Sequence, residues 1–246
     1  LVGSEMCIRD RYKTIKDLGD LNGKVAMLRA DLNVPMDENF HVTNTARIDR
    51  TVPTIKELMN KGAKVVVISH FGRPEGKGDM KNSLSHIVKD LEKALGKHVV
   101  FVDDCIGPKV QEAIKNMKAD EVLLLENLRF YNEEKKGDED FAKELVAPAD
   151  VYVSDAFSTA HRAHASMVAA VKQRPSAMGL LMEEEVNALS KGLNNPKRPL
   201  MAVVGGSKVS TKLDLLNNLV KKVNKLVISG LSLIHISEPT RHLRIS

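Results

Sequence analysis

The chain of 246 residues has few cysteines, few aromatic residues and no long apolar run. Its two cysteines, Cys7 and Cys105, are too few for a disulfide framework at this length, so we expect a reduced, cytoplasmic protein. No stretch approaches the roughly 18–20 apolar residues of a membrane span, and the start does not resemble a signal peptide. We therefore expect no membrane partner.

The scarcity of aromatic side chains also bears on nucleic-acid binding. Aromatic residues make up 4% of the chain and Trp is absent, so platforms on which single-stranded bases stack are scarce. The net charge is +5, but Lys and Arg are spread along the chain instead of forming one basic stripe. We expect no nucleic-acid partner, and keep a nucleic-acid binder as an alternative class.

What the chain does contain is a repeated pattern, in which a short apolar run ends in polar residues. The run at 65–68 leads into Ser69-His-Phe-Gly-Arg-Pro74, and similar runs stand at 25–28, 122–125, 151–153 and 200–204. Such runs are typical of strands buried on both faces of a parallel sheet, whose carboxyl-end loops share one crevice. Here those loops carry Arg, His, Lys, Asn and Gly far more than carboxylates. This predicts a small ligand with several negative charges.

Strands and helices alternate along the chain, which predicts an α/β fold. We expect a Rossmann-like parallel sheet with helices on both faces in a first domain, residues 12–177. Its expected helices cover 48–59 (begun or kinked by Pro53), 83–95, 108–117 and 138–146, with a further strand at 99–102. An apolar seam between chain breakers predicts an interdomain hinge helix at 178–195. Residues 196–230 hold only strand, helix (209–224) and strand, which indicates the start of a truncated second α/β domain.

Both ends of the chain lack a clear period. Residues 1–11 have no initiator Met, and residues 231–246 contain a Pro and scattered basic residues where another helix is expected. We expect both segments to be non-native tails, such as translated adapter or read-through sequence. A genuine disordered tail is the alternative.

Several cationic and polar residues follow the predicted strands. Arg presents a planar fork that holds phosphate or carboxylate oxygens in pairs, so several in one crevice imply a ligand with more than one anionic group. Any single Arg could equally be a solvated surface charge. The histidines His70, His161 and His164 lack carboxylate or Cys partners at ligand spacing, so we expect no metal site. Gly205-Gly206, taken alone, indicates only a tight turn.

Five motifs carry a resemblance to a known family. They are Arg29-Ala-Asp-Leu-Asn-Val-Pro35, Ser69-His-Phe-Gly-Arg-Pro74, Glu126-Asn-Leu-Arg-Phe130, Asp155-Ala-Phe-Ser-Thr-Ala-His-Arg-Ala-His-Ala-Ser166 and Gly205-Gly-Ser-Lys-Val-Ser-Thr-Lys212. In this order, across residues 12–230, they resemble the motifs of the phosphoglycerate kinases. The resemblance implies two α/β domains that close about a hinge helix. One departure is Ser158, where the family often has Gly; we expect it to have little effect.

The resemblance also assigns roles to individual residues. It implies that the first domain holds 3-phosphoglycerate through Asp31, Asn33, Arg47, His70, Phe71, Gly72, Arg73, Arg129 and Arg162. The implied catalytic residues are Arg47, Lys208 and Lys212, which would reach the transferring phosphoryl group from opposite sides. Contacts to the nucleotide, Mg-ADP or Mg-ATP with the metal carried by the nucleotide, would come from Gly206, Lys208 and Lys212. We expect a monomer.

The implied reaction is reversible phosphoryl transfer between 1,3-bisphosphoglycerate and ADP, giving 3-phosphoglycerate and ATP in glycolysis and gluconeogenesis. The enzyme is a phosphotransferase with a carboxyl group as acceptor, and that group is ionised at neutral pH, so no general base is needed. What is needed is alignment and positive charge around the phosphoryl oxygens. The alternative is that the 246-residue chain alone is an inactive 3-phosphoglycerate-binding module.

Overall fold

The computed structural model describes residues 12–118, 120–194, 196–205 and 213–229. The chain divides into two compact units, the first ending at Glu185 and the second beginning at Val186. Each unit is described by itself, and the expected domain limits stay predictions. No helix within the described ranges is long and apolar enough to cross a membrane.

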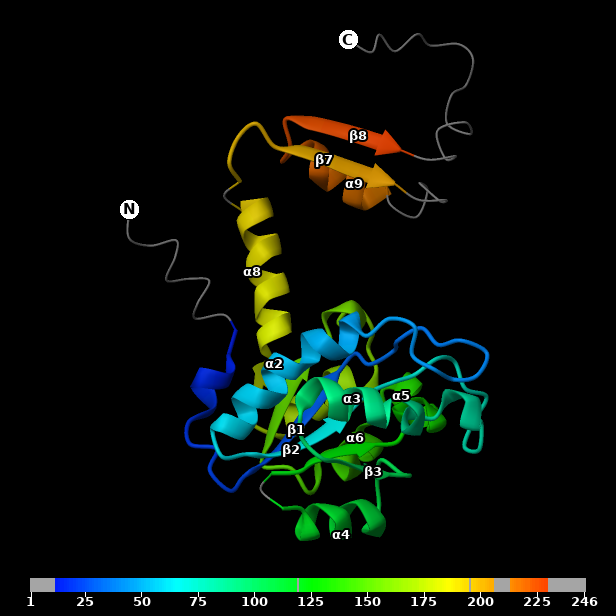
Figure 1. The fold of residues 1–246 in the computed structure, drawn as a ribbon. Helices are drawn as coiled ribbons and strands as arrows, with labels where there is room; N and C mark the ends of the chain where they lie inside the picture. Colours follow the sequence, from blue (N-terminus) through cyan, green and yellow to red (C-terminus); the bar gives the residue numbers. More distant parts are fainter. Residues whose placement is uncertain (1–11, 119, 195, 206–212, 230–246) are drawn as a thin grey trace. The chain divides into compact units, whose positions relative to one another are not determined.

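A six-stranded sheet forms the centre of the first unit (Figure 1). Its strands are β1 (Val25–Ala30), β2 (Lys64–Ile68), β3 (Val99–Val102), β4 (Val122–Leu125), β5 (Val151–Asp155) and β6 (Ser176–Met178). Their order across the sheet is β3-β4-β2-β1-β5-β6, and every pairing is parallel. The parallel sheet predicted from the apolar runs is confirmed, whereas β6 was not predicted.

Helices pack on both faces of this sheet, as expected. One apolar core joins it to α2 (Ala46–Asn60) and α3 (Val88–Leu95), and a second joins it to α4 (Pro108–Asn116), α6 (Glu139–Val146) and α7 (Ala170–Gln173). Strand β2 serves both cores, because Val65 and Val67 pack into the first and Val66 and Ile68 into the second. All four side chains are fully buried. Alternate residues of a strand point to opposite faces, so an unbroken apolar run is what a covered sheet requires.

Two expected helices differ in detail from the prediction. Pro53 lies inside α2 and does not begin it; the buried face of the helix compensates for the lost backbone hydrogen bond. The helix expected at 83–95 begins instead as a 3-10 turn, η3 (Leu84–Ile87), before α3. The Ser83 hydroxyl accepts from Ser85 N at 3.1 Å, which tightens this first turn. As predicted, Gly96 ends the helix in a left-handed conformation.

Short elements complete the first unit. They are η1 (Ile15–Leu18), η2 (Met80–Asn82), η4 (Leu128–Phe130), α5 (Asn132–Lys136), η5 (Phe157–Thr159) and the π-type turn η6 (Ala165–Ala169). The elements η2, η4 and η5 follow β2, β4 and β5 respectively. They therefore belong to the loops at the carboxyl ends of the strands, where ligands of parallel sheets bind.

The second unit contains one strand–helix–strand motif within the described ranges. Strands β7 (Met201–Gly205) and β8 (Lys225–Ser229) pair in parallel, and α9 (Leu213–Val220) connects them. Helix α9 ends four residues earlier than the predicted 209–224, because residues 221–222 form a turn before β8. The predicted hinge segment forms α8 (Leu180–Asn194), which contains the division between the two units.

Candidate functional site

The predicted site residues of the first unit gather at the carboxyl edge of the sheet. Strands β4, β2, β1 and β5 are consecutive neighbours, so the loops that follow them meet. Those loops and the start of α2 carry Asp31, Asn33, Arg47, His70, Phe71, Gly72, Arg73, Arg129 and Arg162. The loops thus bring together residues that lie up to 131 positions apart in the chain.

Asp31 is a nearly buried carboxylate surrounded by donors. Its Oδ2 accepts from Arg47 Nη1 and from Ser158 Oγ, each at 2.5 Å, and its Oδ1 accepts from Asn33 N at 3.2 Å. Burial alone would raise the pKa of Asp31, but the Ser158 hydroxyl and the charges of His70 and Arg47 outweigh it and lower the pKa. Asp31 is therefore ionised at neutral pH and can only accept hydrogen bonds.

The turn at Gly72 connects the loops after β1, β2 and β4. Asn33 Oδ1 accepts from Gly72 N at 2.9 Å, and Arg129 Nη1 donates to Gly72 O at 2.6 Å. Gly72 has a φ of +51°, and a Cβ atom built there would lie 1.7 Å from Asn82 Oδ1. Only glycine fits this turn without strain.

Asn127 holds the backbone around the same turn through its side-chain amide. It was not predicted as a site residue. Its Nδ2 donates to Phe71 O at 2.7 Å and to Asn82 O at 2.8 Å, and its Oδ1 accepts from Phe71 N and Arg129 N, both at 3.0 Å. All four side-chain contacts hold loop backbone. The signal available in the sequence was its place in the Glu126–Phe130 motif, directly after a buried strand.

Arg29 was quoted in a motif but not predicted as a site residue, and it is completely buried. Its guanidinium donates to Ser166 Oγ at 3.1 Å and to Ala30 O, and its Nη2 lies 3.1 Å from His70 Nδ1. Because a guanidinium only donates, the Nδ1 atom of His70 must accept. Glu134, also buried, accepts from Ser166 N and Oγ at 2.9 and 2.6 Å. Glu134 therefore joins a buried negative charge to Arg29 through Ser166.

The basic side chains of the site lower one another's pKa values. Burial, followed by the charges of Arg29 and Arg129, lowers the pKa of His70 to about 3, and Arg162 acts in the same direction against Asp31. Burial also lowers the pKa of Arg129, with Arg162, Arg29 and Arg73 contributing in that direction. The Nε atom of Arg129 is buried and makes no hydrogen bond. These effects indicate a cluster of like charges that a multiply charged anion would neutralise.

The cluster has two parts. We call the buried residues Arg29, His70 and Arg129 the floor, and the exposed residues Arg47, Arg73 and Arg162 the rim. The remaining predicted residues, Gly206, Lys208 and Lys212, lie outside the described residues, so no site for a Mg-nucleotide is described. Within the described ranges no three His, Cys, Asp or Glu side chains gather as a protein metal site would need. What each residue binds stays a prediction.

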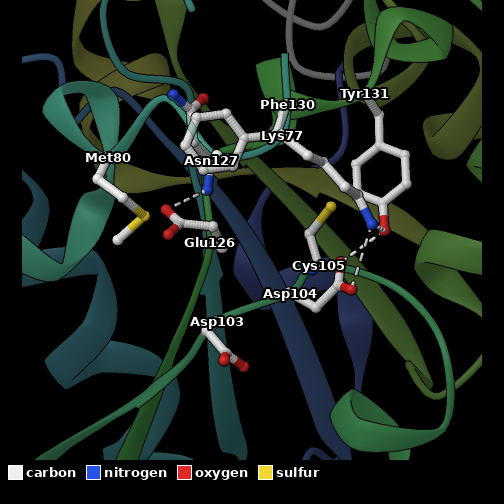
Figure 2. Close-up of a pocket in the computed structure, with 10 residues that line it drawn as sticks. Lys77, Met80, Asp103, Asp104, Cys105, Glu126, Asn127, Phe130 and Tyr131 are labelled. Carbon is white, nitrogen blue, oxygen red and sulfur yellow. Dashed lines mark hydrogen bonds and ion pairs between the residues drawn. The ribbon is translucent and has the colours of Figure 1, made fainter.

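A cavity of about 240 Å³ lies beside the floor, and Asn127 lines it (Figure 2). Figure 2 shows Lys77 and Tyr131 converging on Asp104, and the Tyr131 hydroxyl donates to Asp104 Oδ1 at 2.6 Å. The lining carries three carboxylates, from Asp103, Asp104 and Glu126, against the one ammonium of Lys77. This balance does not suit an anion, so the floor and rim remain the candidate anion site.

Comparisons with known proteins agree with this geometry. The family model described as "Phosphoglycerate kinase" matches residues 15–237. The chain is 52% identical over 219 residues to the phosphoglycerate kinase of Methylorubrum extorquens (strain PA1), covering 89% of this chain and 54% of that protein. It is 53% identical over 219 residues to that of Rhizobium meliloti (strain 1021), covering 89% and 55%.

Solved structures give the same result. The phosphoglycerate kinase from Coxiella burnetii matches with a TM-score of 0.78 and 40% identity, over 89% of this chain and 55% of that one. The enzyme from Pyrococcus horikoshii OT3 matches with a TM-score of 0.80 and 33% identity, over 89% and 56%. The chain spans about half the length of the curated relatives it matches. Because the family model covers most of its residues, the chain belongs to the phosphoglycerate kinase family.

Proposed function

We propose that the first unit holds 3-phosphoglycerate on the floor and rim, as part of a phosphoglycerate kinase. The observation that carries this is the gathering of the site cations around Asp31, which is ionised. The ligand has a phosphate and a carboxylate, which suit the guanidinium groups, and one hydroxyl, which suits Asp31. Each charge-assisted hydrogen bond contributes about 1.5–3 kcal/mol, so several suffice for a very small molecule.

The proposed reaction is phosphoryl transfer between 1,3-bisphosphoglycerate and ADP, giving 3-phosphoglycerate and ATP. In the reverse direction, from 3-phosphoglycerate and ATP, the attacking carboxylate is already ionised and needs no general base. The pKa of His70 is too low for a charged imidazole at neutral pH, so the arginines supply the positive charge of the site. Arg47, at the start of α2, is the rim residue proposed to reach the transferring phosphoryl group. Gly206, Lys208 and Lys212 are proposed to contact the Mg-nucleotide and, through the lysines, the same group from the other side.

We further propose that this chain by itself binds 3-phosphoglycerate without turnover, as a cytoplasmic monomer. The absence of turnover is supported by the span of the chain, which is about half the length of its relatives. A coupled assay with ADP and 1,3-bisphosphoglycerate tests this. Turnover above background by the purified 246-residue chain would contradict it, while the binding proposal would stand.

Calorimetric titration of the chain with 3-phosphoglycerate tests whether the site binds this ligand. Arg73→Ala and Arg162→Ala should each weaken binding at least about tenfold, the size of one charge-assisted hydrogen bond. Added salt should weaken binding to the parent chain, because the rim is exposed to solvent. Arg50→Ala is the matched control: Arg50 is an exposed Arg of α2 that pairs with Glu184 at 3.1 Å. Unchanged affinity in both rim variants would remove them from the site.

A further inference from the structure

We propose that Ser158 is a positioning residue that leaves Asp31 a single free acceptor position, and so makes binding depend on the hydroxyl of the ligand. This inference rests on the proposed function, because it concerns how the same site selects 3-phosphoglycerate. Ser158 stands where the family often has Gly, and we expected little effect from it. The structure instead gives its hydroxyl a direct contact with a predicted ligand-binding carboxylate.

The Asp31 carboxylate has a limited number of acceptor positions. Each oxygen of an ionised carboxylate offers about two. Oδ2 accepts from both Arg47 Nη1 and Ser158 Oγ, so it is filled, whereas Oδ1 accepts only from Asn33 N in the described structure. With Asp31 only 9% exposed, the remaining position on Oδ1 is the one left for a ligand.

Ser158 is held in place by the hydrogen bonds of its own turn. Its turn, η5, is closed by hydrogen bonds from Thr159 N to Ala156 O at 3.1 Å and from Ala160 N to Phe157 O at 3.0 Å. Phe40 is the one non-glycine residue with a positive φ in the described ranges, so Ser158 needs no strained backbone. The single hydroxyl proton of Ser158 is committed to Asp31, because a hydroxyl has only one to donate.

Only one group of the ligand can donate a hydrogen bond to Oδ1 of Asp31. At neutral pH its carboxylate and the oxygens of its phosphate mainly accept, so its hydroxyl is the group that can donate to Oδ1. A ligand in which hydrogen replaces this hydroxyl leaves the Oδ1 position unsatisfied in a nearly buried place, which is costly. Removing the Ser158 hydroxyl frees a position on Oδ2, which water or a rotated carboxylate can use. The preference for the hydroxyl should then fall.

The experiment is calorimetric titration of the 246-residue chain with two ligands, 3-phosphoglycerate and its 2-deoxy analogue, 3-phosphonooxypropanoate. In Ser158→Ala and Ser158→Gly the affinity for 3-phosphoglycerate should fall about fivefold, the size of one hydrogen bond, and that for the analogue should stay within about twofold. Ser158→Thr keeps the hydroxyl and should restore the preference. The control is Ser176→Ala, whose Oγ lies 2.7 Å from Val171 O and 2.8 Å from Arg174 O, so its one proton goes to a backbone carbonyl and not to a carboxylate.

Each other outcome is decisive. Equal losses for both ligands, or no loss for either, would leave the ratio of the two affinities unchanged and would overturn the inference; equal losses would also mean that Ser158 only supports the fold. If the parent chain binds neither ligand, the proposed function fails, and this inference fails with it. If the parent binds and the rim variants weaken binding while the Ser158 variants do not, the proposed function stands and the inference alone is wrong.

Discussion

The floor and the rim of the site use the same side chain in opposite ways. On the floor, Arg29 donates to Ala30 O and Ser166 Oγ, and Arg129 donates to Gly72 O, so their guanidinium groups hold protein atoms. On the rim, Arg73 and Arg162 are exposed to solvent. A donor that is already engaged fixes geometry, whereas the exposed guanidinium groups of Arg73 and Arg162 remain available to a ligand. Two residues are intermediate, because Arg129 keeps one Nε without a partner on the floor and Arg47 already pairs with Asp31 on the rim. The comparison separates positioning from binding within one cluster of arginines.

The free energy needed to keep the side chains charged also differs between the floor and the rim. A buried charge is tolerated only when hydrogen-bonded and balanced, and the balance on the floor comes from Glu134 through Ser166. The exposed arginines need no such support, because water solvates them. Substitutions on the floor should therefore lower stability as well as affinity, whereas substitutions on the rim should lower affinity alone.

The largest effect is expected for Arg29→Met. The change removes a fully buried cation that donates to Ser166 Oγ, which in turn donates to the buried Glu134. Removing one member of a buried charged network costs about 3–5 kcal/mol of the free energy of unfolding. Arg73→Ala, an exposed control, should change it by no more than about 0.5 kcal/mol. Urea denaturation followed by circular dichroism measures both. Equal losses in the two variants would erase the distinction between floor and rim.

A smaller loss of stability is expected for Gly72→Ala, which tests the turn that Arg129 holds. The new Cβ would meet Asn82 Oδ1 at 1.7 Å, at a φ of +51°, so strain and overpacking together should cost about 2–4 kcal/mol. Gly76→Ala is the control in the same loop, because nothing lies within 4 Å of its added Cβ. The double variant Gly72→Ala, Asn82→Ala should recover the part due to the clash. No recovery would assign the whole loss to the backbone conformation.

How much of this arrangement the sequence could predict depends on the distance between partners. The strands at 65–68 and 122–125 were predictable, because an apolar run is a local signal of a covered strand. Strand β6 was not, because its three residues, Ser176–Met178, are too short to show a period and form an edge strand paired with β5. The helix expected at 138–146 was likewise a local signal, and the structure has α6 at Glu139–Val146, with Asp138 accepting from Phe141 N at 2.8 Å as its cap.

The site shows the same limit. Arg73 and Arg162 lie after β2 and β5, where the motifs that contain them follow the predicted strands. Arg29 was missed as a floor residue, because its partner Ser166 lies 137 positions away. Ser158 and Asp31 are 127 positions apart, so no local pattern could join them. What made these contacts is the strand order, in which β5 lies beside β1. The sequence therefore predicts which residue types reach the crevice, and the fold decides which of them become scaffold.

The smallest effect on the free energy of unfolding is expected from lowering the pH. The test compares His70 on the floor with the exposed His161. Burial, then Arg29 and Arg129, lowers the pKa of His70 to about 3, with Arg162 adding to this and Asp31 opposing it; an unfolded His has a pKa of about 6.5. Between these values the unfolded chain binds more protons, so the free energy of unfolding should fall as pH falls below about 6.5.

Between about pH 7 and 5, where carboxylates of ordinary pKa stay mostly ionised, His70 should contribute a slope of up to about 1.4 kcal/mol per pH unit. The variant His70→Gln keeps an acceptor for Arg29 and should lose that slope. The exposed His161→Gln should keep it, and subtracting the parent curve cancels the other titrating groups. Urea denaturation at several pH values gives the three slopes. Identical slopes in the parent and in His70→Gln would mean that His70 is not held neutral, and that the floor accepts a third positive charge.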